Sequence, residues 1–121
     1  AAPLGSMYAA PHGMLCGRLL PFVMRTNINA LQSRQPDSLQ LKRYAELAVL
    51  LTGNPDAATL DGLQWIKDCC ADLQVPGLAS FGVQSVDIPE ITTKALEASS
   101  MRGNPIQLTQ GEVATILSDA L

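Results

Sequence analysis

His12 is the residue whose chemistry and setting most favour a functional role. It is the single histidine of the chain, and it stands between Pro11 and Gly13 where a helix is predicted to begin. An imidazole binds metals and transfers protons near neutral pH, and the glycine leaves room for a ligand to approach the helix start. A metal site usually needs three or four protein ligands, so His12 cannot build one alone. A structural or surface histidine is the alternative that the composition leaves open.

No other catalytic constellation is visible in the sequence. No serine and carboxylate stand at a spacing from His12 that would indicate a Ser-His-Asp triad. The chain also has no Cys-x-x-Cys or His-x-x-x-His pair for a metal, and no glycine-rich turn after a strand for a nucleotide phosphate. The three cysteines are Cys16, Cys69 and Cys70. We predict them to be buried small apolar residues in a reducing, cytoplasmic compartment, not disulfide partners. Cys16 follows His12 by four residues, so the two side chains can share a helix face.

The bulk composition narrows the class of protein. A length of 121 residues suits one domain with one modest core, and a hydrophobic content of 47% argues against disorder. The formal net charge is −3 and the Lys and Arg residues are scattered, so nucleic acid, which requires a basic stripe, is not an expected partner. No run of about 18 apolar residues exists. We therefore expect no membrane span, and no cleavable signal is recognisable either.

The elements that must position His12 are helices. Apolar residues recur at spacings of three and four, and no alternating pattern persists, which predicts an all-α bundle of about five or six helices. The predicted helices cover residues 1–9, 11–29, 38–52, 57–74, 85–100 and 110–120, with one short turn at residues 78–81. Thr109 and Glu112 have the spacing of a capping box, which marks the start of the last helix.

The helix predicted over residues 11–29 is expected at the centre of the bundle. Its apolar residues cover most of its circumference: Met14, Leu15, Leu19, Leu20, Val23 and Met24. Pro21 is expected to bend this helix, because proline removes a backbone hydrogen bond to the preceding turn. The helix over residues 57–74 is expected to bury one face, formed by Leu60, Leu63, Ile66, Cys70 and Leu73.

Several short motifs of the chain occur together in one known family. They are APLG at residues 2–5, Pro11-His12-Gly13, and LLPFVMRTN at residues 19–27. Residues 44–48, 73–76, 87–90, 103–105 and 108–117 continue the likeness in the same order. With these motifs, the chain resembles the C-terminal helical domain of the iron-containing (group III) alcohol dehydrogenases over essentially its whole length. The fold implied by the resemblance is part of a dehydroquinate synthase-like C-terminal domain.

The resemblance implies that residues 1–121 are one all-α domain of a larger two-domain enzyme. In that family an N-terminal nucleotide-binding domain holds NAD or NADP, and the helical domain holds a divalent metal, iron and sometimes zinc, through one aspartate and three histidines. His12 matches the last of these histidines. The other ligands and the nucleotide domain would precede Ala1, so we expect no tightly bound metal or nucleotide, and no activity, in these 121 residues alone.

The resemblance also indicates where the substrate, a small alcohol or aldehyde, would lie. Ser100 and Met101 match a stretch near the mouth of the substrate cleft, although a plain loop between helices is an alternative for these residues. Three positions depart from the family pattern: Ala2 stands where many members have a further active-site histidine, Phe22 where His or Tyr is frequent, and Arg18 where a small residue is usual. These departures leave the substrate class open.

Two other functions remain open at the level of the sequence. One is a metal-independent relative in the same superfamily, similar to maleylacetate reductase. The other is a non-catalytic helical interaction domain, which does not explain the ordered motifs. In the favoured reading the main partner is the protein's own N-terminal nucleotide-binding domain, and association into a homo-oligomer is compatible with the sequence.

Overall fold

The structure, a computed structural model, describes residues 1–121 and is all-helical, which confirms the predicted fold class. It contains six α-helices, three short 3-10 helices and no strand. The α-helices are α1 (Ala2–Met7), α2 (His12–Arg34), α3 (Leu39–Thr52), α4 (Thr59–Asp72), α5 (Ile88–Glu97) and α6 (Gln110–Asp119). The 3-10 helices are η1 (Leu78–Phe81), η2 (Ser85–Asp87) and η3 (Ser99–Gly103). No helix is both long and apolar enough to cross a membrane.

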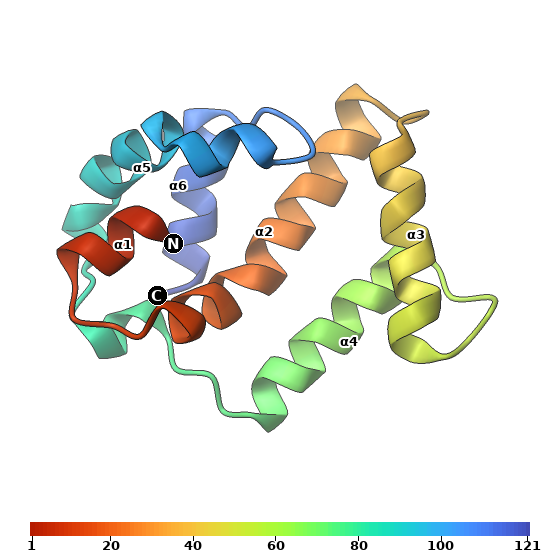
Figure 1. Cartoon of the computed structure of the whole chain (residues 1–121), viewed down its shortest axis with the longest axis horizontal. Helices are drawn as coiled ribbons and strands as arrows, with labels where there is room; N and C mark the ends of the chain where they lie inside the picture. Colours follow the sequence, from red (N-terminus) through yellow and green to blue (C-terminus); the bar gives the residue numbers. More distant parts are fainter.

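Helix α2 runs through the middle of the molecule and separates two groups of helices (Figure 1). Helices α1, α5 and α6 lie on one side, and the antiparallel pair α3 and α4 lies on the other. The apolar residues of α2 divide accordingly. Leu15, Leu19 and Leu31 belong to the large core cluster, whereas Met24 and Ile28 pack with Leu63 of α4 in a smaller one. The central position predicted for this helix is therefore confirmed.

Helix α2 differs from the prediction in length and in burial. It continues to Arg34, and Pro21 lies inside it without ending it. The predicted burial of most of its circumference is wrong for Met14 and Leu20, which are 40% and 47% exposed. The two groups of helices therefore leave both side chains partly uncovered.

The apolar face predicted for α4 is also wrong in part. Leu60 and Leu73 are 56% and 72% exposed, and Leu63 is the large residue of this helix that is buried. The reason is a close approach of α4 to α3 at Gly62. A Cβ atom built on Gly62 would lie 2.9 Å from both Cα and Cβ of Ala48. This contact sets which side of α4 faces the molecule, and it turns Leu60 away from α3.

Local signals set most helix ends as the sequence predicts. The Ser38 side chain accepts a hydrogen bond from the backbone N–H of Leu41 at the start of α3, and Gly53 ends that helix with a φ of 69°. The capping box before α6 is confirmed: the hydroxyl of Thr109 accepts from the N–H of Glu112 at 3.2 Å, and the Glu112 carboxylate accepts from the N–H of Thr109 at 3.3 Å. Such boxes satisfy N–H groups that lack partners inside the helix.

Candidate metal-ligand site at the start of α2

The first turn of α2 is anchored to the core by the buried side chain of Leu15. Pro11 is the N-cap residue, and its carbonyl accepts the N–H groups of Met14 and Leu15. Leu15 is fully buried and belongs to the same core cluster as Leu4 of α1. Because Leu15 points into the core, the side chains of His12 and Cys16 lie on the exposed surface of the helix. The helix start thus offers an imidazole to solvent or to another part of a larger protein.

His12 and Cys16 form a pair on this exposed surface. The Sγ atom of Cys16 lies 3.3 Å from Nε2 of His12, which confirms that the two residues share a helix face. The predicted burial of Cys16 is wrong, because this side chain is exposed. Cys69 and Cys70 are half-buried and unpaired. Burial raises the pKa of the Cys70 thiol, which donates to the carbonyl of Gly17 at 3.6 Å.

The donors present in this chain fit a part of a metal site. No group of three or more His, Cys, Asp and Glu side chains that could hold a metal ion occurs in residues 1–121. His12 is exposed, and a Cβ atom on Gly13 would meet nothing within 4 Å, so no other part of residues 1–121 packs closely on Gly13 next to His12. His12 can therefore contribute one nitrogen to an ion whose remaining ligands come from elsewhere.

The predicted cleft residues lie apart from His12. Ser100 and Met101 belong to η3 and face a hollow of about 350 Å³ beside the start of α1. The residues that line this hollow are Ala1, Pro3, Ala95, Ala98, Ser100, Met101, Gly103, Asn104 and Pro105. Figure 1 shows the segment after α5 at one end of this group of helices and the start of α2 at the other. The structure thus does not bring the predicted ligand and the predicted cleft residues into one pocket.

Two of the three departures from the family motif have a structural explanation. The guanidinium carbons of Arg18 and Arg25 lie 5.1 and 5.6 Å from the ring centroid of Phe22, a geometry in which each cation is attracted to the ring. The Nε–H of Arg18 also donates to the carbonyl of Ala120 at 2.8 Å, and Arg25 forms an ion pair with Asp119. Arg18 and Phe22 therefore hold the end of α6 against α2.

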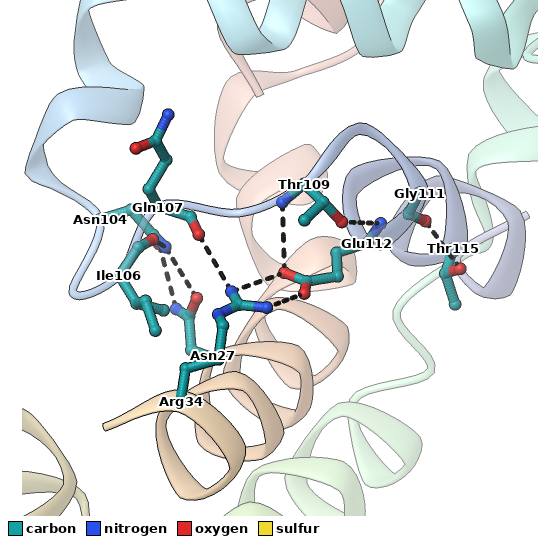
Figure 2. A network of polar contacts seen from close by, with 9 residues as sticks. All are labelled: Asn27, Arg34, Asn104, Ile106, Gln107, Thr109, Gly111, Glu112 and Thr115. Carbon is teal, nitrogen blue, oxygen red and sulfur yellow. Dashed lines mark hydrogen bonds and ion pairs between the residues drawn. The ribbon is translucent and has the colours of Figure 1, made fainter. Parts of the chain in front are cut away.

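A buried amide pair joins α2 to the loop after η3, and sequence reasoning missed it (Figure 2). Asn27 is 2% exposed, and its amide group exchanges hydrogen bonds of 3.0 and 2.8 Å with the amide of Asn104. Asn27 also donates to the hydroxyl of Tyr44 at 3.2 Å, and Asn104 donates to the carbonyl of Ile106. The sequence did contain a signal for this pair: Asn27 stands among the apolar positions of α2, and a buried amide requires hydrogen-bond partners.

An ion pair fixes the far end of α2 to the start of α6 (Figure 2). Arg34 pairs with Glu112 and donates to the backbone carbonyl of Gln107 at 3.0 Å. The hydrogen bond from Arg34 lowers the pKa of the Glu112 carboxyl below its ordinary value. The carboxylate of Glu112 thus serves both the capping box and the contact between α2 and α6.

The structure is an all-helical domain with Pro-His-Gly at the start of its central helix. The sequence model of the Fe-containing alcohol dehydrogenase family, C-terminal, matches residues 1–121. The chain belongs to this family, which confirms the family inferred from the motifs.

Named relatives and one solved structure agree with this assignment. The chain is 30% identical over 126 residues to the 1,3-propanediol dehydrogenase of Citrobacter freundii, covering 99% of this chain and 30% of that protein. It is 28% identical over 121 residues to the lactaldehyde reductase of Escherichia coli (strain K12), covering 99% of this chain and 31% of that enzyme. The crystal structure of a 1,3-propanediol oxidoreductase aligns with a TM-score of 0.81 at 29% identity, covering 99% of this chain and 31% of that one. The chain thus spans about a third of the length of these relatives.

Proposed function

We propose that these 121 residues are the C-terminal helical domain of an NAD(P)-dependent, metal-containing alcohol dehydrogenase. The observation that carries the proposal is the match of the family model over residues 1–121, with His12 exposed at the start of the central helix. The relatives are named for a diol and for an aldehyde, which favours a small alcohol or aldehyde as substrate. The N-terminal nucleotide-binding domain would be the partner that holds NAD or NADP.

His12 would contribute one ring nitrogen to the divalent metal, iron or zinc. When bound, such an ion polarises the oxygen of the alcohol or carbonyl group that exchanges hydride with the nicotinamide. The imidazole must be neutral to offer its lone pair, and the open space next to Gly13 leaves room for the rest of the site to approach. Ser100 and Met101 line a hollow that does not include His12, so a role for them in the substrate cleft would require the N-terminal domain to join the two regions.

Replacement of His12 by alanine in the full-length enzyme tests this proposal. His12 is exposed, so the fold should be retained, whereas metal content and turnover should fall together and nicotinamide binding should survive. Met14→Ala is a matched control, because Met14 is exposed in the same turns of α2 and carries no nitrogen donor. That variant should keep both metal and activity.

Three results would contradict the proposal. If His12→Ala unfolds the protein but leaves the metal bound, His12 is a structural residue. If activity persists with full metal occupancy, the ligand role is wrong, and if the wild-type enzyme turns over without metal, the parent resembles the metal-independent maleylacetate reductases. The isolated 121-residue chain should bind neither Zn²⁺ nor NADH stoichiometrically, because it contains one histidine and no nucleotide phosphate site.

A further inference from the structure

The inner cavity, a small void inside the larger group of helices, is a feature of the molecule that the proposed site does not use. It lies between α1, α2, α5 and α6 and has a volume of about 80 Å³. Eleven of the 13 residues that line it are hydrophobic. Among these, Leu4, Ile91, Val113 and Ile116 are at most 5% exposed. The inner cavity therefore belongs to the main apolar core.

The one polar side chain at the inner cavity, Asn104, already has its hydrogen-bond partners. Its amide nitrogen donates to the side-chain carbonyl of Asn27 at 2.8 Å and to the backbone carbonyl of Ile106. Its own carbonyl oxygen accepts from the amide of Asn27 at 3.0 Å. A water molecule buried in a protein usually needs two to four polar partners. The inner cavity therefore favours an apolar occupant over water.

Met101 lies between the inner cavity and the surface. The inner cavity shares Ala1, Pro3, Ala95, Met101 and Asn104 with the hollow of about 350 Å³ beside the start of α1. Met101 also lines another hollow, of about 670 Å³, on the opposite side of η3 from α1. Methionine is unbranched and has three rotatable bonds, so its side chain changes conformation easily. A rotation of Met101 thus gives a small molecule a way into the core without any unfolding of a helix.

We infer that the inner cavity is a binding site for one small apolar molecule. A dry apolar cavity of about 150 Å³ takes up benzene or xenon. At about half of that volume, the inner cavity should take up xenon or a hydrocarbon of about three carbons, and it should exclude benzene. Such an occupant supplies the van der Waals contacts that the lining side chains lack. The site needs neither His12 nor a metal, so it is independent of the proposed function.

Crystals of the full-length enzyme under xenon pressure test the site. Xenon should give an anomalous-scattering peak inside the inner cavity, next to Val113 and Ile116. Ala95→Leu should lose this peak, because the larger side chain fills space at a residue that lines both the inner cavity and the hollow outside it. Ala71→Leu is the matched control and should keep the peak, since Ala71 is exposed on α4 and lines neither space.

Val113→Ala is a second variant that tests the site if Ala95→Leu does not fold. It enlarges the inner cavity, so crystals soaked in benzene should show benzene there, whereas wild-type crystals should not. Wild-type crystals without a xenon peak in the inner cavity, or with ordered water in it before xenon is added, overturn the inference. A peak that Ala95→Leu retains, or a Val113→Ala variant that excludes benzene, does the same. Each of these results leaves the proposed function intact, because metal content and turnover in His12→Ala test that function separately.

Discussion

Replacement of Asn27 by alanine should destabilise the protein strongly, although alanine is the better helix former. Asn27 is buried in the middle of α2, where its amide group takes part in three side-chain hydrogen bonds to Asn104 and Tyr44. These bonds connect α2 with α3 and with the loop that precedes α6. The variant removes all of them and leaves the carbonyl oxygen of Asn104 without its partner.

The size of the effect follows from these contacts. A buried neutral hydrogen bond contributes about 1 kcal/mol net, and a buried polar group left without a partner costs about 1–3 kcal/mol. The gain in helix propensity from asparagine to alanine is at most about 0.7 kcal/mol. The difference is a loss of roughly 2–4 kcal/mol in the free energy of unfolding. For a chain of this size each kcal/mol lowers the melting temperature by about 3–6 °C.

Urea and thermal unfolding followed by far-ultraviolet circular dichroism measure this loss. Asn29→Ala is the matched control, because Asn29 lies two residues further along the same helix with its side chain exposed. It should be neutral or slightly stabilising, since only the propensity term remains. Asn104→Ala should cost about as much as Asn27→Ala, and the double variant should cost less than the sum by about 1–3 kcal/mol.

Three outcomes would refute this reasoning. A loss below about 0.5 kcal/mol for Asn27→Ala would mean that water replaces the amide pair at no cost. Equal losses for Asn27→Ala and Asn29→Ala would mean that position in the helix, and not the hydrogen bonds, sets the effect. Additive losses for Asn27 and Asn104 would show that the two amides do not act as a pair.

Three further substitutions test packing, burial and charge. Gly62→Ala should lower the midpoint of thermal unfolding, since the new Cβ atom would lie 2.9 Å from Ala48 of α3. Gly111→Ala is the control and should raise that midpoint, because α6 has space for a Cβ atom there. Equal shifts of the two variants would contradict the close approach of α4 to α3. Thr92→Val should stabilise the protein by about 1 kcal/mol in urea unfolding, because its buried hydroxyl has no hydrogen-bond partner, and a loss would show that the hydroxyl is bonded. Arg34 lowers the pKa of Glu112 from its ordinary 4.5, so wild type should exceed Glu112→Gln in stability above about pH 4.5. That difference should vanish as the pH falls through the lowered pKa, and a difference that stays constant in acid would exclude the ion pair as its source.

The helices were predictable because their ends depend on local chemistry. Capping residues such as Ser38 and Thr109, and the left-handed glycine Gly53, act within a few residues of the helix that they bound. The end of α2 was missed for the opposite reason. Its last three residues, 32–34, are polar and resemble a loop, although apolar burial continues through Leu31, and Arg34 gains its partner Glu112 from a helix far along the chain. A contact across such a distance in sequence leaves no local pattern.

The candidate site was predictable in its spacing but not in its exposure. Cys16 follows His12 by four positions, which places the two residues on one helix face in any α-helix. Whether that face is buried depends on where α1 and the core lie, and Leu15 decides it by pointing inward. Because cysteine is often buried in proteins, we predicted burial for Cys16, and that prediction is wrong since its side chain is exposed. The role of His12 as a ligand remains a prediction, since the chain contains no complete donor set.

Two of the departures from the family motif, Arg18 and Phe22, form contacts between helices. The ring of Phe22 contacts the guanidinium groups of Arg18 and Arg25, which bind the last residues of α6. These side chains act together, so a histidine at position 22 would weaken a contact between helices and would not by itself restore a catalytic group. His12 lies at the start of the same helix, on the exposed surface. Because α2 is continuous from His12 to Arg34, contacts along its length fix the position of the helix start that carries the imidazole.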